Sequence, residues 1–268
     1  MCLLVLAWRA HPRYRLIVAA NRDEFHARPS AALAKWPARE GEIGAGILAG
    51  KDLKAGGTWL GLDARRRFAV VTNYRDLQRS APGAPSRGEL IPRYLSQATG
   101  GREFLEALEP SAERYAGFNL LVSDADALWY ASNRAQPFAR QLPPGVYGLS
   151  NHLLDTPWPK LARVRHSFRA WLDATPDPDP DELLGMLADS RPAAAHEPLP
   201  ETGLPPEWER VLSSPFVLHP DYGTRCSTVL LIEPSGAVRL TERRFERTGA
   251  MSGETAIRLG AGEWPRAI

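Results

Sequence analysis

The first twenty-five residues constrain the fold most strongly, because two apolar runs of strand length lie on either side of a single break. The runs cover residues 1–8 and 16–25, and the charged, proline-containing stretch 9–13 separates them. Charge and proline interrupt both helical and strand periodicity, which is typical of a turn between neighbouring strands. The sequence therefore predicts a buried β-hairpin at the start of the chain.

The register of this hairpin brings reactive side chains together. With the turn centred near His11, antiparallel pairing places residues opposite each other when their numbers sum to about 22 to 24. Cys2 then lies opposite residues 20–22, next to Arg22 and Asp23. Neighbours in a strand point to opposite faces, so the sequence leaves open whether both Arg22 and Asp23 face Cys2.

A cysteine at the second position can hold a nucleophile and a base on one residue. Removal of Met1 would give Cys2 a free α-amine with a pKa of about 7.7 to 8, which can accept the thiol proton. Arg22 would favour the thiolate, and Asp23 would favour the ammonium. The alternative is that Cys2 only begins a buried strand, since free cysteine is among the most frequently buried residues.

Composition narrows the class of protein. The 268 residues, 44% of them hydrophobic, can bury a substantial core, and no linker divides them, so we expect a single domain over 1–268. The 33 basic and 31 acidic residues form no basic tract, which argues against nucleic acid as a partner. Two cysteines indicate a reducing, cytoplasmic location. The apolar stretch 2–7 is too short for a membrane span.

Further hairpins and blocks of helices are expected along the chain. After an irregular segment at 25–57 with a short strand near 47–48, strands are expected at 58–63, 68–73, 118–122, 127–131, 138–142, 146–150, 226–232 and 237–244. Helices are expected at 87–98, at 103–115 with an interruption at Pro110, and at 156–172, 181–188 and 206–213. Successive hairpins with inserted helices predict an α+β protein with antiparallel sheets. Phosphate-loop, GxSxG, HExxH and paired CxxC motifs are absent.

A set of short segments spread through nearly the whole chain resembles a known family. The segments are MC at 1–2, NRDEF at 21–25, RP at 28–29, GGTWLG at 56–61, TNYR at 72–75, SRGE at 86–89, GFNLL at 117–121, GLSNH at 148–152, TPWPK at 156–160 and GTR at 223–225. Together they resemble the NRDE family, the family of transport and Golgi organisation protein 2 and its bacterial relatives. The resemblance implies an N-terminal nucleophile (Ntn) hydrolase-like fold, a four-layer αββα sandwich with two antiparallel sheets, similar to choloylglycine hydrolases.

The resemblance also implies a catalytic set, at Cys2, Arg22, Asp23, Asn73, Asn151 and Arg225. In such a site Cys2 attacks a carbonyl, and Asn73 and Asn151 donate hydrogen bonds toward the developing oxyanion. Arg225 would bind an anionic substrate or steady Asp23. The expected activity is that of an amidase or acyltransferase on a C–N amide or acyl bond of a small, partly apolar substrate, with no cofactor or metal required.

The same resemblance implies a second possible function, because haem trafficking and lipid or acyl-CoA homeostasis are both proposed for the family. A non-catalytic carrier would use the pocket to hold haem or an acyl chain, and fold alone does not decide between the two. The candidate substrate-binding residues are His26, Trp59, Tyr74, His152 and Trp158. Their alternative roles are structural, because histidines beside turns usually hydrogen-bond locally and aromatic residues at strand ends are commonly core. The chain has no CxxCH haem-attachment motif.

Overall fold

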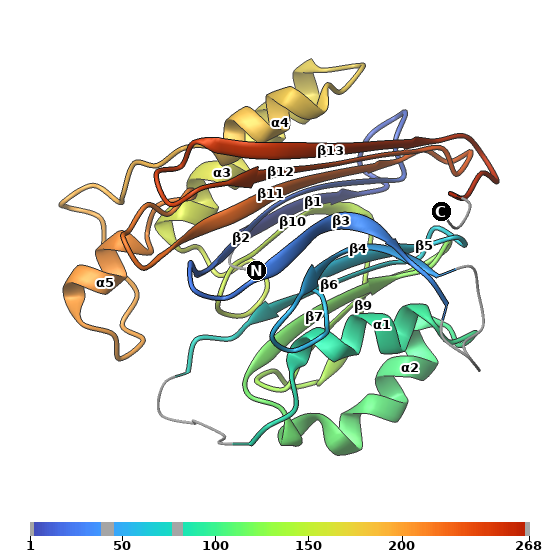
Figure 1. The fold of residues 1–268 in the computed structure, drawn as a ribbon, viewed down its shortest axis with the longest axis horizontal. Coiled ribbons are helices and arrows are strands. Elements are labelled where there is room, and N and C mark those ends of the chain that lie inside the picture. The colour runs from blue at the N-terminus through green and yellow to red at the C-terminus, as the bar shows by residue number, and fades with distance from the viewer. Residues whose placement is uncertain (1–2, 39–45, 77–82, 266–268) are drawn as a thin grey trace.

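Two antiparallel β-sheets lie face to face, with helices on their outer faces, in a computed structural model that describes residues 3–38, 46–76 and 83–265 (Figure 1). In these residues the first sheet has six strands in the order β10-β1-β2-β11-β12-β13, and the second has seven in the order β3 to β9. Helices α3 and α4 cover the first sheet, and α1 and α2 cover the second. The layers are therefore αββα, which confirms the predicted fold class.

The first sheet contains β1 (Leu3–Trp8), β2 (Leu16–Phe25), β10 (Gly145–Leu149), β11 (Tyr222–Ile232), β12 (Val238–Phe245) and β13 (Met251–Leu259). The second contains β3 (Ser30–Trp36), β4 (Ile47–Asp52), β5 (Leu60–Asp63), β6 (Phe68–Asn73), β7 (Phe118–Ser123), β8 (Leu128–Ser132) and β9 (Ala139–Leu142). The helices are α1 (Leu90–Leu95), α2 (Gly101–Leu108), α3 (Pro159–Ala174), α4 (Pro180–Leu187) and α5 (Pro206–Val211). None of these helices has the length and hydrophobicity that crossing a membrane requires.

The first hairpin forms with the predicted register. Leu3 lies opposite Asn21 and Leu4 opposite Ala20, so that paired numbers sum to 24. Side chains on one face of β1, such as Leu4, pack between the sheets, whereas those on the other, such as Leu3, pack against α3 and α4. Burial of both faces explains why this run is apolar throughout and does not alternate. Cys2 lies outside the described residues.

Two edge strands were not predicted, and one boundary was wrong. The segment expected to be irregular contains β3, and the C-terminal part of the chain contains β13. Both are edge strands with exposed positions and no strong apolar pattern, so pairing with β4 and β12 stabilises them rather than propensity. Arg225 was expected just before a strand, but β11 begins at Tyr222 and includes it. Asn73, the last residue of β6, pairs with Phe118 of β7 and has no partner in β5, which begins only at Leu60.

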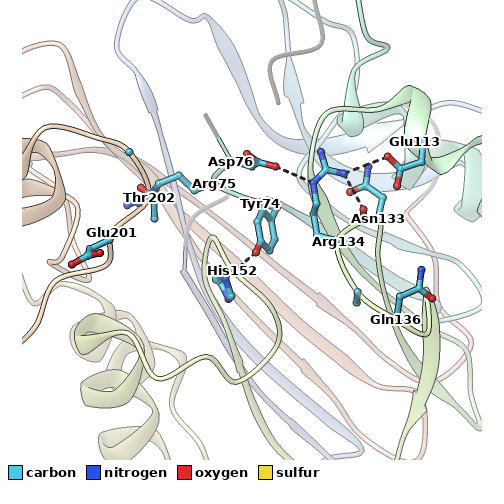
Figure 2. A pocket seen from close by; sticks show the side chains of 12 residues that line it. Tyr74, Arg75, Asp76, Glu113, Asn133, Arg134, Gln136, His152, Glu201 and Thr202 are labelled. Atoms are coloured by element: carbon cyan, nitrogen blue, oxygen red, sulfur yellow. Dashed lines mark hydrogen bonds and ion pairs between the residues drawn. The ribbon is translucent and has the colours of Figure 1, made fainter. Parts of the chain in front are cut away.

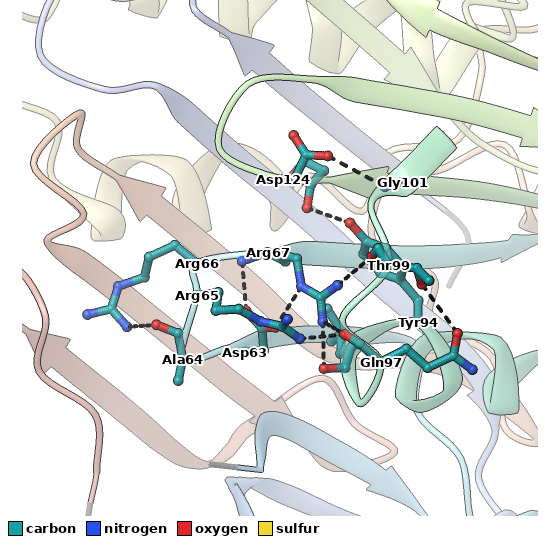
Figure 3. Close-up of polar contacts among 12 residues, drawn as sticks. Asp63, Ala64, Arg65, Arg66, Arg67, Tyr94, Gln97, Thr99, Gly101 and Asp124 are labelled. Carbon is teal, nitrogen blue, oxygen red and sulfur yellow. Dashed lines mark hydrogen bonds and ion pairs between the residues drawn. The ribbon is translucent and has the colours of Figure 1, made fainter. Parts of the chain in front are cut away.

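A buried arginine joins the second sheet to its helices (Figure 3). Arg67 follows the β5–β6 turn, is 4% exposed and forms an ion pair with Asp63 at 2.8 Å. Its remaining donors reach three main-chain carbonyls at and after the end of α1, those of Leu95, Gln97 and Thr99, at 2.6 to 2.8 Å. Carbonyls at the end of a helix lack partners within the helix. Arg67 therefore supplies those partners and anchors α1 to the sheet.

Candidate functional site

The end of β2 carries Arg22 into the space between the two sheets. Its side chain is buried, and its guanidinium lies 4.4 Å from the ring centre of Trp59 on the second sheet. Nη2 is 3.7 Å from a carboxylate oxygen of Glu24, and Nη1 has no hydrogen-bond partner among the described residues. Cys226 of β11 lies directly opposite Arg22. A buried guanidinium with an unused donor is suited to holding an anion.

Asp23 points away from this space. Its Oδ1 accepts a hydrogen bond from the Thr224 hydroxyl at 2.7 Å, and the same hydroxyl accepts one from the Val217 amide. Its strand neighbour Asn21 is also on the helix side, where its amide donates to the carbonyl of Leu187. Arg22 and Asp23 therefore face opposite sides of β2, as alternation along a strand requires.

Arg225 and His26 form a second contact at the same end of the first sheet. Arg225 Nη1 donates to His26 Nδ1 at 2.9 Å, and His26 Nε2 in turn donates to the carbonyl of His219 at 3.0 Å. This pattern requires a neutral imidazole with its proton on Nε2. Burial, with a contribution from the charge on Arg225, lowers the pKa of His26. His26 is therefore an uncharged acceptor, and it does not compensate the positive charge of Arg225.

The two predicted asparagines are brought together, but their side chains differ in environment. Asn151 is 4% exposed, and its Nδ2 donates to the main-chain carbonyl of Asn73 at 3.0 Å. The side chain of Asn73 is exposed. Arg75 donates its main-chain amide to the Asn151 carbonyl at 2.7 Å. The end of β6 and the loop after β10 are therefore tied to each other at this point.

Sequence reasoning missed the residues that hold this loop. Three neighbouring strands of the second sheet each contribute one polar side chain, namely Thr72, Asn119 and Tyr130, and these bond the main chain of residues 150, 152 and 154. The hydroxyl of Thr72 donates to the Ser150 carbonyl at 3.0 Å, and Asn119 donates to the His152 carbonyl at 3.0 Å. The amide of Leu154 donates to the hydroxyl of Tyr130, which itself donates to Asn119. The available signal was a polar residue inside an apolar strand, as in FNLLV at 118–122.

Tyr74, His152 and Thr156 form a hydrogen-bonded chain at the edge of a polar pocket of about 610 Å³ (Figure 2). The Tyr74 hydroxyl is 2.8 Å from His152 Nε2, and His152 Nδ1 is 2.9 Å from the Thr156 hydroxyl. Trp158 packs against His152, with ring centres 5.8 Å apart. Burial lowers the pKa of His152 and raises that of Tyr74, so both are uncharged near neutral pH. The pocket also contains Arg134, which is paired with Asp76.

A larger and more apolar groove of about 940 Å³ lies between the edge strands of the two sheets. Its lining comes from β3, β4, β13 and the segment that follows β13, and includes Leu33, Leu48, Ile257, Leu259 and Trp264. Lys35 and Arg258 are also part of the lining. In the part of the chain that the structure describes, no group of three or more His, Cys, Asp or Glu side chains is arranged to hold a metal ion.

A family model and the similar proteins of known sequence all indicate the same family. The model of the family described as Transport and Golgi organisation 2 matches residues 1–247. The Transport and Golgi organization protein 2 homologs of Bos taurus and Homo sapiens are each 35% identical to this chain, over 265 and 261 residues, covering 91% of this chain and 92% of each relative. The Drosophila melanogaster protein is 27% identical over 267 residues, covering 90% of this chain and 91% of its own.

Solved structures share the fold at very low identity. A mutant of the conjugated bile acid hydrolase from Clostridium perfringens superimposes with a TM-score of 0.53 and 8% identity, covering 97% of this chain and 92% of the hydrolase. The Caenorhabditis elegans ortholog of N-acylethanolamine-hydrolyzing acid amidase gives 0.52 and 11%, covering 87% of this chain and 93% of the amidase. At these identities the likeness concerns the fold alone. The chain has an Ntn-hydrolase-like fold and belongs to the Transport and Golgi organisation 2 family.

Proposed function

We propose that the protein is an N-terminal cysteine amidase or acyltransferase that acts on a C–N amide or acyl bond of a small, partly apolar substrate. The observation that carries the proposal is Arg22, a buried guanidinium with an unused donor on the strand paired with the start of the chain. Residue 2 is bonded to Leu3, whose partner Asn21 precedes Arg22. The fold likeness to a bile acid hydrolase and an acid amidase supports the same class of reaction.

The proposed chemistry uses Cys2 as both nucleophile and base. After removal of Met1, the α-amine accepts the thiol proton, and the thiolate attacks the carbonyl carbon of the substrate. The tetrahedral intermediate breaks its C–N bond, the ammonium of Cys2 returns the proton to the leaving amine, and a thioester remains. Water completes hydrolysis, or a second amine completes transfer. Amide donors such as those of Asn151 and Asn73 would stabilise the oxyanion, each worth about 3 kcal/mol of barrier.

Mass spectrometry of the intact protein from its native host tests the first requirement. We expect Met1 to be absent, because its retention would block the α-amine that serves as the base. The protein is then incubated with N-acyl amides of increasing chain length and quenched in acid. An adduct of acyl mass on the N-terminal peptide, absent in Cys2→Ala, supports the proposal. Retained Met1 on essentially all molecules would refute the catalytic mechanism and leave the fold unaffected.

A second candidate function is favoured by the apolar groove between the edge strands. A non-catalytic carrier could hold an acyl-CoA or lipid chain there, with Lys35 and Arg258 near its anionic group. The described residues lining the groove include no His, Cys or Met, so an acyl chain suits it better than the iron of haem.

Titration with acyl-CoA and with haem separates the two functions. Saturable one-to-one binding that Ile257→Glu weakens and Cys2→Ala leaves unchanged would support a carrier. The matched control is Met251→Glu, which changes an exposed side chain at the other end of the same strand. Absence of saturation with both ligands would count against carriage.

A further inference from the structure

Glu242 is a buried acid that the chemistry proposed above does not use. It lies on β12 and is 2% exposed. Leu240 and Val238, two and four positions earlier on the same face of the strand, belong to the core between the sheets. A carboxyl group in such a place is costly unless it is hydrogen-bonded or paired with a charge. Its partners therefore indicate what it does.

One partner of Glu242 is on the opposite sheet. Its Oε1 accepts a hydrogen bond from the main-chain amide of Leu33 at 2.7 Å. Leu33 lies in β3, where the pairing with β4 is irregular between Ala31 and Ala34. An irregularity of this kind leaves a main-chain amide without its ladder partner. Glu242 satisfies that amide and thereby links β12 of the first sheet to the edge of the second.

The second carboxylate oxygen of Glu242 lies beside Gly50, close to the Trp59 indole. It lies 3.0 Å from the place that a Cβ at Gly50 would occupy, and the Trp59 indole approaches the same place even more closely. The guanidinium of Arg22 also contacts this indole. The acid, the indole and the guanidinium are therefore consecutive neighbours, in a space that glycine at position 50 leaves open.

The charged and titratable groups around Glu242 come from several elements. They are Arg22 from β2, Cys226 from β11 and Arg244 from β12, whose Nη1 is 3.6 Å from Oε1. The contacts from the second sheet are the Leu33 amide of β3, Gly50 of β4 and Trp59, which precedes β5, and on β13 the paired residue is Thr255. Burial raises the pKa of Glu242, and the cations Arg244 and Arg22 act in the opposite direction. By the same coupling, an ionised Glu242 offsets part of the positive charge of Arg22.

We propose that Glu242 is a positioning residue that acts through Arg22 and weakens the attraction of Arg22 for a thiolate at residue 2. This inference rests on the proposed function, in which Arg22 favours the thiolate of Cys2. Only β2 and β11 separate β12 from β1, the strand that begins next to Cys2. At an effective dielectric constant near 20, a unit charge three strand spacings from the thiol changes the equilibrium between thiol and thiolate by roughly threefold to tenfold.

The test is the pH profile of Cys2 alkylation by iodoacetamide, followed by mass spectrometry of the N-terminal peptide from pH 5 to pH 9. Glu242→Gln keeps an oxygen for the Leu33 amide but removes the charge. We expect its profile to move to lower pH and its rate at pH 7 to rise by roughly threefold to tenfold. Glu242→Asp retains the charge and should stay near the wild type. The control is Glu254→Gln, an exposed acid on β13 paired with Arg243, which should leave the profile unchanged.

Each outcome separates this inference from the function on which it rests. A folded Glu242→Gln variant with the wild-type profile, or an equal shift in Glu254→Gln, overturns the role of Glu242. If Glu242→Gln loosens the protein, Cys226 becomes labelled as well. The pH profile of the wild-type protein then decides. A second inflection of the labelling rate, at a lower pH than the inflection of the Cys2 thiol, supports the inference, and the absence of this second inflection overturns it. A wild-type Cys2 that reacts no faster than Cys226 instead refutes the activated thiol of the proposed function.

Discussion

Replacing Asn119 by alanine should both loosen the loop that carries Asn151 and lower the free energy of unfolding of the whole protein. The fully buried Asn119 side chain donates to Thr72 and to the His152 carbonyl, and it accepts from Tyr130. Three groups lose this partner. Thr72 keeps its hydrogen bond to the Ser150 carbonyl, whereas the buried Tyr130 hydroxyl proton and the part-buried His152 carbonyl are left unsatisfied. Each unsatisfied group costs about 1 to 3 kcal/mol, so we expect the free energy of unfolding to fall by about 2 to 5 kcal/mol.

Urea unfolding followed by tryptophan fluorescence measures this change in the free energy of unfolding. The control is Asn73→Ala, which removes an exposed amide of the same kind and should cost about 0.5 kcal/mol or less. Hydrogen exchange gives a local readout, because the Leu154 amide is bonded to the Tyr130 hydroxyl and should exchange faster in Asn119→Ala. A loss below about 1 kcal/mol with unchanged protection of Leu154 would show that Asn119 does not hold the loop.

Three further predictions concern other parts of the molecule. Arg67→Met should lower the free energy of unfolding by about 3 to 5 kcal/mol, since Asp63 keeps only the half-exposed Arg65 as a cationic partner and three main-chain carbonyls lose their donor. Arg102→Ala at an exposed helical pair should cost under about 0.5 kcal/mol. Iodoacetamide at neutral pH should label Cys2 well before Cys226, whose thiol is buried and has a raised pKa; equal rates in peptide mapping would contradict this. The pKa of His152 is lowered in the folded state, so the unfolded chain binds more protons as pH falls below about 6.5 and stability should decrease there. His152→Gln should flatten that decrease in melting temperature, and an unchanged slope would exclude His152 as its source.

Local patterns predicted much of the fold because many strands pair with the strand that precedes or follows them in the sequence, as throughout the second sheet. The first hairpin has its predicted register, and the interruption expected at Pro110 is where α2 gives way to a 3-10 helix after Leu108. The edge strand β13 could not be predicted in this way. It is half exposed, and its partner β12 supplies the hydrogen bonds that make it a strand.

The candidate site likewise has features that the local sequence predicts and features that it does not. Alternation along a strand is a local property, so the sequence by itself determined that Arg22 and Asp23 face opposite sides of β2. The environment of Asn151 is not local, because Asn119 holds its loop from another sheet. No spacing in the sequence indicates which polar residue of a buried strand will meet a loop more than thirty positions away.

The amino-acid sequence by itself determined the class of fold, the hairpin that begins the chain and the family, since these follow from periodicity, turns and short motifs. Only the tertiary structure decided that Glu242 meets Leu33 across the two sheets and that Gly50 leaves space for its carboxylate. The physical reason is that burial and hydrogen-bond partners depend on how the sheets stack. A carboxylate that looks like a surface charge in the sequence becomes a buried group beside Trp59 and Arg22 only when the second sheet covers it.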